Sequence, residues 1–274
     1  MRLVKESEGP EPDVCVVMPV GRVDAYLLPA IRSILDQTGV ATQLIIAFDG
    51  VDPELPDAVQ SDPRVTVLHS PVGQGIARTL NSALAHAGSD VVARMDSDDL
   101  ALPGRLERQI AYLRRHPEVG AVGSYASVID GNGANLGVLR GPSSPFLMRL
   151  SLQFRNPVVH PSVMFRRSVV ARVGGYREEA EGVEDHDLWL RMSRVADVTV
   201  LPSVLLEYRR HGGQVTVRRV SEAQYRVLLE AKLAGRSGLS AFRVRTSHGL
   251  MMVARRRLGK VESPQRAAAT DRSG

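Results

Sequence analysis

Short apolar stretches alternate with amphipathic helical segments over the first hundred residues, and this alternation restricts the possible folds most strongly. The stretches 14–18, 43–48, 65–68 and 91–95 are mainly apolar and rich in β-branched residues, which predicts strands, while 24–37 and 76–87 place apolar residues on one helical face. Such alternation is typical of an α/β protein with a parallel sheet, right-handed crossovers and a ligand site at the carboxyl ends of the strands. Asp49 and Asp96 fall at two of these ends.

The composition fits one globular domain or two closely packed halves. Of the 274 residues, 43% are hydrophobic and 24% charged, which excludes wholesale disorder and a fibrous repeat. No apolar run reaches the roughly 18 to 20 residues that span a bilayer, and the start MRLVKESEGPEPD lacks the apolar core of a signal peptide, so we expect a cytoplasmic protein. The single cysteine, Cys15, excludes an intrachain disulfide and a cysteine-based metal site.

Positive charge is concentrated at the C-terminus. Residues 1–204 carry 20 basic and 25 acidic groups, whereas 205–274 carry 15 and 5. Helical periodicity over 219–233 and 239–258 predicts two amphipathic helices there, which either pack on the preceding domain or lie on an anionic membrane surface. Without interleaved aromatic residues or zinc-finger spacing, the tail does not predict a nucleic-acid partner.

The second half of the chain follows a looser pattern. After Pro103 we expect a helix over 106–116, a hairpin around DGNG at 130–133, a strand over 162–165, a glycine-rich turn at 174–176 and a helix from Glu184. These elements predict a mixed half that follows the parallel one.

The segment ARMDSDD, residues 93–99, delivers three carboxylates directly after a predicted strand. Because carboxylates repel one another, a cation that offsets the repulsion would stabilise such a group, and oxygen ligands suit Mg²⁺ or Mn²⁺ carrying phosphate oxygens. Asp96 and Asp98 could thus face a nucleotide diphosphate. A solvated acidic turn that caps the following helix is the alternative at this point.

Three further segments carry candidate chemistry. EDHDLWLR, residues 184–191, opens a helix with acidic residues, which helix capping alone could explain. VGQGIARTLN, residues 72–81, places glycines and Arg78 at a helix start, where a polar ligand can bind, but matches neither the dinucleotide fingerprint nor the Walker A pattern. YRRHGGQVTVRR, from Tyr208, could clamp a diphosphate with Arg210 and His211 or could form an ordinary basic strand end.

Taken in order, these segments resemble the inverting family-2 glycosyltransferases of the GT-A fold over about residues 13–214. The matching pieces are VVMPVGRVDAYLLPAIRSILDQT, LIIAFDG, GQGIARTLNSALAHAGSDVVARMDSDD, PGRLERQIAYLRRHPEVGAVGS, HPSVMFRRSVVARVGGY, EDHDLWLRM and YRRHGGQVT. The resemblance implies a Rossmann-like, mostly parallel central sheet with helices on both faces. It also implies a flexible segment 1–12, a catalytic domain 13–214 with nucleotide-binding (13–100) and acceptor (101–214) halves, and a basic helical extension 215–274.

The resemblance also implies a reaction: transfer of a sugar from a UDP- or dTDP-sugar to an acceptor hydroxyl with inversion, using Mg²⁺ or Mn²⁺, in cell-surface polysaccharide or glycoconjugate synthesis. The acceptor would be a glycan, a lipid-linked sugar or a small molecule, and the basic tail could touch the inner face of the membrane. It assigns Asp185 as catalytic base, Asp98 and His211 to the metal, Pro19, Val20, Asp49, Arg78, Asp96 and Arg210 to the donor, and Glu184, His160 and Trp189 to the acceptor.

Some features depart from the family pattern or leave other functions open. The family often has two acidic residues and a serine where this chain reads Phe48-Asp49-Gly50-Val51, which affects base and ribose contacts. A nucleotidyltransferase would require a glycine-rich basic loop after the first strand, and MPVGRVDAYL matches this poorly. An aspartyl phosphatase would have its DxD after the first strand, whereas here it follows the fourth. A non-catalytic sugar-nucleotide or glycan-binding protein remains an alternative, with Asp185 as the discriminating residue.

Overall fold

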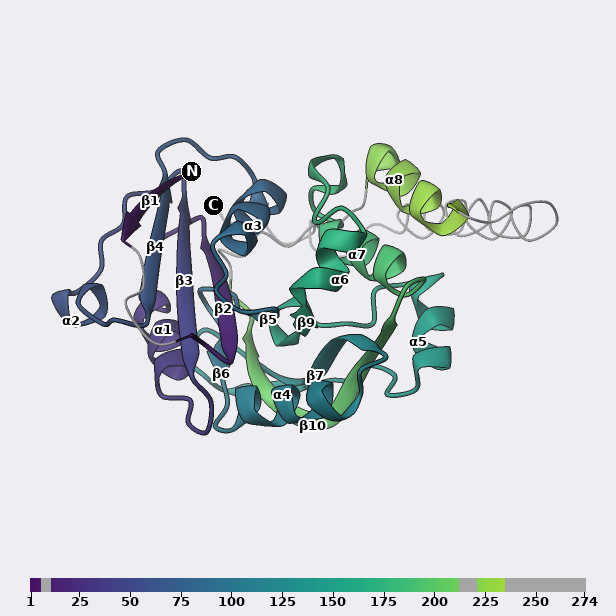
Figure 1. Cartoon of the computed structure of the whole chain (residues 1–274), viewed down its shortest axis with the longest axis horizontal. Coiled ribbons are helices and arrows are strands. Elements are labelled where there is room, and N and C mark those ends of the chain that lie inside the picture. Colours follow the sequence, from purple (N-terminus) through teal and green to yellow (C-terminus); the bar gives the residue numbers. More distant parts are fainter. Residues whose placement is uncertain (6–10, 212–220, 235–274) are drawn as a thin grey trace, which may run out of the picture.

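The computed structural model describes residues 1–5, 11–211 and 221–234, which form one continuous ten-stranded sheet with helices on both sides (Figure 1). The strand order is β1-β4-β3-β2-β5-β9-β7-β10-β6, and β8 pairs with β7 outside this path. The bounds are β1 Arg2–Lys5, β2 Val14–Val20, β3 Thr42–Asp49, β4 Val65–Ser70, β5 Val91–Arg94, β6 Leu100–Ala101, β7 Val119–Ile129, β8 Asn135–Leu139, β9 Met164–Arg166 and β10 Asp197–Arg209.

The N-terminal half has the parallel sheet that the sequence predicts. Strands β4, β3, β2 and β5 are all parallel, and each expected strand lies within a few residues of its predicted position. The helices between them are α1 (Leu27–Leu35), α2 (Asp57–Gln60) and α3 (Ile76–Ala85), followed by α4 (Arg105–Arg115). The α/β class is therefore confirmed.

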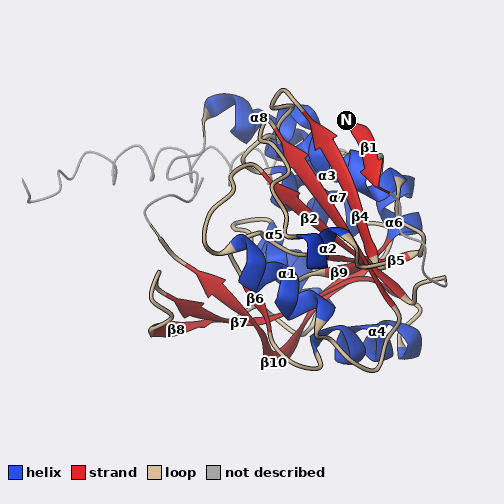
Figure 2. Ribbon diagram, turned by 90° about the vertical axis from the view of Figure 1, so that its left-hand side faces the viewer, coloured by secondary structure: helices blue, strands red, loops and turns tan. Residues whose placement is uncertain are grey.

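Both faces of this sheet are covered because successive side chains of a strand point to opposite faces. On one face, Val14, Val16 and Met18 of β2 pack with apolar residues of α1 and α4; on the other, Cys15 and Val17 pack with those of α3. Figure 2 shows helices on either side of the strands. Burial on both faces explains the nearly continuous apolar composition of β2 and β3.

The first residues differ from the expectation of a flexible segment 1–12. Arg2–Lys5 form β1, which pairs antiparallel with β4, opposing Leu3 to Leu68, and so extends the edge of the sheet. A strand of four residues has too little hydrophobic periodicity to be recognised, and its partner rather than its own propensity determines its conformation.

The second half is mixed, as predicted. Strand β9 runs antiparallel to both β5 and β7, and β10 runs parallel to β7 with irregular register. The hairpin β7–β8 turns at DGNG, where the Asp130 carboxylate accepts hydrogen bonds from the backbone N–H groups of Asn132 (2.8 Å) and Ala134 (2.9 Å). Its helices are α5 Pro145–Leu152, η1 His160–Ser162, α6 Arg167–Arg172, η2 Glu178–Ala180 and α7 Glu184–Met192.

The C-terminal extension starts with a helix, α8 (Glu222–Leu233), close to the expected 219–233. Ser221 and Gln224 form a capping box, and the Gln224 side chain also donates to the Glu181 carbonyl at 2.6 Å, which ties α8 to the segment before α7. The second expected helix, 239–258, lies outside the described residues. None of the described helices is long and apolar enough to cross a membrane.

Candidate active site

Asp49 ends β3 and holds the loop that follows β4. Its carboxylate accepts hydrogen bonds from the backbone N–H groups of Gln74 (2.8 Å) and Gly75 (3.1 Å), just before α3 begins. The next residue, Gly50, has φ +73°, and a Cβ there would lie 2.9 Å from the Gly73 nitrogen. Glycine thus permits the close approach of the loops after β3 and β4, at the carboxyl edge of the parallel sheet.

The acidic segment after β5 gathers its carboxylates as predicted. One oxygen from each of Asp96, Asp98 and Asp99 lies within 4.8 Å of the others. Burial raises the pKa of Asp96, opposed by the charge of Arg94, and burial together with the charges of Asp96 and Asp98 raises the pKa of Asp99 well above its usual value. A bound cation would relieve this mutual repulsion, so the donor set fits a divalent ion.

The end of β10 lies against this acidic segment. The Arg209 backbone N–H donates to Asp99 Oδ1 at 2.7 Å, and the Arg209 guanidinium donates to the Asp98 carbonyl at 2.9 Å. His211 Nε2 lies 3.0 Å from Asp98 Oδ2. Asp98 and His211, 113 positions apart in the chain, therefore meet as the family resemblance implied.

Asp99 is less accessible than its two neighbours. Its side chain is fully buried, and its Oδ2 atom has no hydrogen-bond partner among the described residues. By accepting the Arg209 backbone N–H, it anchors the strand that delivers His211. Asp99 therefore has a structural contact with β10, whereas the side chains of Asp96 and Asp98 remain partly exposed.

Two acidic residues open α7. Asp185 Oδ2 accepts a hydrogen bond from the Asn156 amide at 2.5 Å, and its Oδ1 accepts one from the His186 backbone N–H at 2.6 Å. Burial is the main cause that raises the pKa of Asp185, and burial with the charge of Asp185 raises the pKa of Glu184 to about 7. Glu184 Oε2 has no hydrogen-bond partner among the described residues. The pair offers a fixed carboxylate, Asp185, beside one that exchanges its proton near neutral pH.

A buried arginine that the sequence reasoning did not select connects the two acidic groups. Arg94, the last residue of β5, is 3% exposed and forms an ion pair of 2.5 Å with Asp96 Oδ2. Its charge also opposes the rise in the pKa values of Glu184 and Asp185. A charged residue within the apolar stretch 91–95 was the available signal, because a buried guanidinium requires anionic partners.

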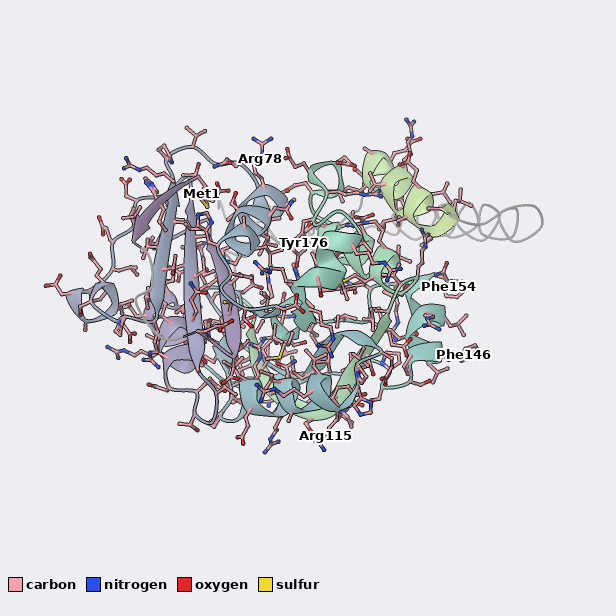
Figure 3. All side chains as sticks on the ribbon, in the orientation of Figure 1. Met1, Arg78, Arg115, Phe146, Phe154 and Tyr176 are labelled. Carbon is pink, nitrogen blue, oxygen red and sulfur yellow. The ribbon has the colours of Figure 1, made fainter. Side chains whose placement is uncertain are left out.

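The expected donor contacts differ in accessibility. Arg78 stands near the start of α3 at the surface, where it forms an ion pair of 2.6 Å with Glu178 (Figure 3). Val20 is buried and Pro19 half-buried at the end of β2, and Arg210, exposed after β10, donates its backbone N–H to the Ile129 carbonyl at 2.7 Å. Of these residues, Arg78 and Arg210 are exposed and Pro19 is half-buried.

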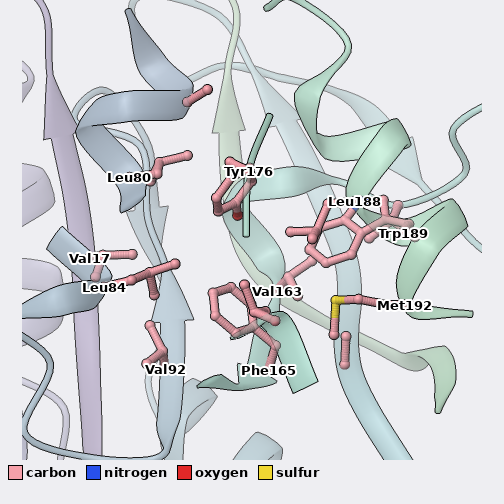
Figure 4. Packing of buried hydrophobic residues seen from close by; sticks show 14 of the residues in the cluster. Val17, Leu80, Leu84, Val92, Val163, Phe165, Tyr176, Leu188, Trp189 and Met192 are labelled. Atoms are coloured by element: carbon pink, nitrogen blue, oxygen red, sulfur yellow. The ribbon is translucent and has the colours of Figure 1, made fainter. Parts of the chain in front are cut away.

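All three residues expected at the acceptor are buried, with exposed fractions of 7% for Glu184 and 8% for His160. Trp189 has no exposed surface and packs in the core beside Leu188 and Met192 (Figure 4), so its burial argues against direct contact with an acceptor. His160 Nε2 lies 2.9 Å from the Tyr176 hydroxyl, and burial holds the pKa of His160 well below its usual value. The Trp189 ring lies against the His160 ring, with centroids 5.9 Å apart, within a core to which α8 also contributes Val227, Leu228 and Ala231.

Fold and site together define a transferase of the GT-A fold. The family model for glycosyl transferase family 2 matches residues 15–174, and the chain belongs to this family. The fold resembles that of S. aureus TarS residues 1–349 in complex with UDP-GlcNAc, with a TM-score of 0.71 at 14% identity over 91% of this chain and 76% of that one.

Curated relatives support the same family. The chain is 34% identical over 206 residues to the O-antigen biosynthesis glycosyltransferase WbnJ of Escherichia coli, covering 72% of this chain and 80% of the relative. It is 35% identical over 237 residues to the amylovoran biosynthesis glycosyltransferase AmsE of Erwinia amylovora, covering 81% and 88%. The predicted family and fold are therefore confirmed.

Proposed function

We propose that this glycosyltransferase moves a sugar from a UDP- or dTDP-sugar to an acceptor hydroxyl, with inversion, during synthesis of a bacterial cell-surface polysaccharide or glycoconjugate. The names of the two relatives, which refer to O-antigen and amylovoran biosynthesis, support the pathway class. The observation that carries the chemistry is the pairing of Asp98 with His211 beside Asp96. The charge of buried Arg94, which pairs with Asp96, also opposes the rise in the pKa of Asp185.

Asp98 and His211, with Asp96 beside them, would hold Mg²⁺ or Mn²⁺. The crowded oxygens of the acidic segment and the buried Asp99 Oδ2 atom support a cation near this place. A divalent ion bound there would neutralise negative charge on a departing nucleotide diphosphate. Arg210, exposed beside His211, would add a positive charge to the same region.

The donor nucleotide would lie along the carboxyl ends of β2, β3 and β5. Asp49 would accept a hydrogen bond from the base, Pro19 and Val20 would line its pocket through their backbone, and Asp96 would contact the ribose. Arg78 would reach the nucleotide after releasing Glu178. This placement follows the rule that ligands of parallel α/β sheets bind at the carboxyl ends of the strands.

Asp185 would act as the general base. Hydrogen bonds from Asn156 and from the His186 backbone fix its carboxylate, and its raised pKa makes it a better proton acceptor than an exposed aspartate. The acceptor hydroxyl would pass its proton to Asp185 as its oxygen attacks the anomeric carbon and the nucleotide diphosphate leaves from the opposite side. Glu184, and His160 if its surroundings open, would contact the acceptor.

Two substitutions separate these roles. Asp185→Asn keeps the size of the side chain but removes its basicity, so we expect transfer to fall about 10³-fold while donor binding changes less than about threefold. Asp98→Ala removes a metal ligand, so we expect it to weaken Mn²⁺-dependent donor binding as well. Transfer is measured by release of free nucleotide, and donor binding by thermal shift with UDP- and dTDP-sugars with and without Mn²⁺.

The matched control is Asp187→Asn, on the same helix. Asp187 is fully buried and accepts hydrogen bonds from Arg191, so this change should lower stability without a selective loss of the chemical step. Undiminished transfer by Asp185→Asn would remove the base assignment. Metal-independent donor binding by the wild type, unchanged in Asp98→Ala, would remove the metal assignment.

A further inference from the structure

Helix α5 is apolar on two sides, which is unusual for a helix at the surface of a domain. Met148 and Leu152 are fully buried in the core. The exposed fractions on the other side are 72% for Phe146, 50% for Leu147 and 51% for Leu150, and Phe154 just beyond the helix is 51% exposed. Figure 3 shows Phe146 and Phe154 at the outer edge of the molecule. A helix that is apolar all round normally requires an apolar contact on each side.

These four side chains form one patch, which we call the α5 face. Phe146, Leu150 and Phe154 repeat every four residues, a spacing that places helical side chains above one another. The described residues expose ten large apolar side chains, and four of these fall within residues 146–154. Scattered exposed apolar residues are ordinary, but a contiguous group indicates an interaction surface.

The α5 face is held rigidly on the domain. In addition to the buried Met148 and Leu152, Arg149 donates to the Ser193 carbonyl at 3.1 Å and pairs with the Asp197 carboxylate. Phe146 therefore stands on a fixed helix, and Phe154 follows its end by two residues. A preorganised surface binds without a large cost of ordering.

Basic side chains predominate in the sequence around the α5 face, and the acidic Asp197 pairs with Arg149 there. Residues 131–177 contain seven arginines and no aspartate or glutamate, and Arg155 beside Phe154 is exposed. Helices α5 and α8 both pack on α7 at the same end of the molecule (Figure 1), and the 40 residues after Ala234 carry nine basic and two acidic groups. Apolar side chains flanked by arginines complement an anionic lipid surface, where rings enter the interface and guanidinium groups meet phosphate.

The α5 face is also directly connected to the proposed base. His186 Nε2 lies 2.8 Å from the Leu152 carbonyl at the end of α5, and Asn156, two residues after Phe154, donates to Asp185. A surface in contact with the α5 face would therefore lie beside the acceptor side of the site. That arrangement suits an acceptor sugar carried on a membrane lipid.

We propose that the α5 face rests on the surface of an anionic lipid bilayer and presents the Asp185 side of the site to a lipid-linked acceptor. The choice of acceptor rests on the proposed glycosyltransferase function, but the lipid contact itself does not require catalysis. This lipid contact is distinct from one made by the basic tail, because its apolar side chains belong to the folded domain.

Tryptophan substitution tests the contact directly. The chain has one tryptophan, Trp189, which is fully buried, so Phe146→Trp introduces an exposed indole. With full-length protein and phosphatidylcholine vesicles containing phosphatidylglycerol, we expect a blue shift of its emission. Leu136→Trp, at a 58% exposed position on β8, is the matched control and should show no shift.

Loss of the contact is measured by vesicle flotation. We expect the double variant F146S/F154S to bind the same vesicles at least about tenfold more weakly than wild type, since two phenyl groups that would enter the lipid interface are removed. We expect L136S to bind like wild type. Donor binding, measured separately by thermal shift, should be unchanged in all variants. Absence of donor binding in the wild type would contradict the proposed function, whatever the flotation result.

Three outcomes would overturn the lipid proposal. Flotation of F146S/F154S equal to wild type would show that the basic tail alone carries binding or that the tail covers the α5 face. No flotation of the wild type would exclude a lipid contact. A wild-type dimer that F146S/F154S dissociates, without a blue shift on vesicles, would identify a second copy as the occupant.

Discussion

Arg94 is the residue on which the electrostatics of the site depend most. It is buried, it forms an ion pair with Asp96, and its charge counteracts the cost of burying Glu184 and Asp185. Removing a buried charge leaves its partners uncompensated, which is more costly than removing an exposed ion pair.

We therefore expect Arg94→Met to lower the free energy of unfolding by about 3 kcal/mol, whereas Arg114→Met, which removes the exposed pair with Asp13, should change it by less than about 1 kcal/mol. Without Arg94 the pKa of Asp185 should rise further, so the acidic limb of the pH–rate profile should move to higher pH. Urea unfolding and rates between pH 5 and 9 measure both effects. Equal destabilisation by the two variants would show that Arg94 is not a buried compensating charge.

Ionisation of Glu184 makes the free energy of unfolding depend on pH. Its pKa is raised from 4.5 to about 7 in the folded chain, so between these values the folded state holds a proton that the unfolded state releases. Ionising Glu184 therefore costs stability as the pH rises from about 4.5 to 7. Glu184→Gln removes that cost. We therefore expect the free energy of unfolding of the variant, relative to that of wild type, to be about 1 to 3 kcal/mol greater at pH 8 than at pH 5.

Thermal unfolding of both proteins at the two pH values measures this gain. The comparison uses the difference between pH 8 and pH 5, so any constant effect of the amide cancels. A difference that does not change with pH would mean that Glu184 ionises normally in the folded chain.

At the residue scale, the sequence indicated the carboxylates but not their surroundings. Asp49 and Asp96 could be placed because strand ends are readable from apolar stretches, and Asp98 and His211 because their motifs match a family. The hydrogen bonds of Asp49 to the loop at Gln74 could not be predicted, since they depend on how two loops approach. The burial of Trp189 could not be predicted either, since its ring lies against His160 in a core that also takes in residues of α8.

At the scale of elements, the loops after β3 and β4 form a unit closed by Asp49 and Gly50. Gly50→Ala would place a methyl group 2.9 Å from the Gly73 nitrogen at a positive φ, so we expect a loss of about 3 kcal/mol, with weaker donor binding. Gly133→Ala also has a positive φ, but no atom lies within 4 Å of its Cβ, so about 1 kcal/mol is expected.

Urea unfolding separates the clash from the backbone strain in this pair of variants. Equal losses at the two positions would contradict a tight approach between the loops. Donor binding by Gly50→Ala at wild-type strength would show that the loop geometry does not position the nucleotide.

The first-half strands were predicted better than those of the second half for a physical reason. Strands β2 and β3 are buried on both faces and therefore have apolar sequences of their own. Strand β7 contains Gly120, whose missing Cβ allows Ala196 to approach within 2.7 Å of that position, and β10 contains Pro202 at an irregular register. These features follow from tertiary neighbours and weaken the local strand pattern.

At the scale of the whole molecule, the sheet joins the two halves that would contribute to the proposed site. Strand β5 of the parallel half pairs with β9 of the mixed half. The positive charge of Arg94, at the end of β5, opposes the rise in the pKa of Asp96 in one half and of Asp185 in the other. The α5 face extends from the mixed half beside the proposed base. Under the proposed function, Asp49 and Asp96 of the parallel half would serve the donor, and Asp185 of the mixed half would serve the acceptor.

A crystal structure of the full-length protein with UDP and Mn²⁺, with anomalous scattering recorded at the manganese edge, tests this shared site most directly. We expect one manganese peak bonded to the Asp98 carboxylate, with the diphosphate on it and the Asp185 carboxylate facing the same cavity. A manganese peak away from Asp96 and Asp98, or an Asp185 side chain that opens onto a surface unconnected with the bound UDP, would contradict it.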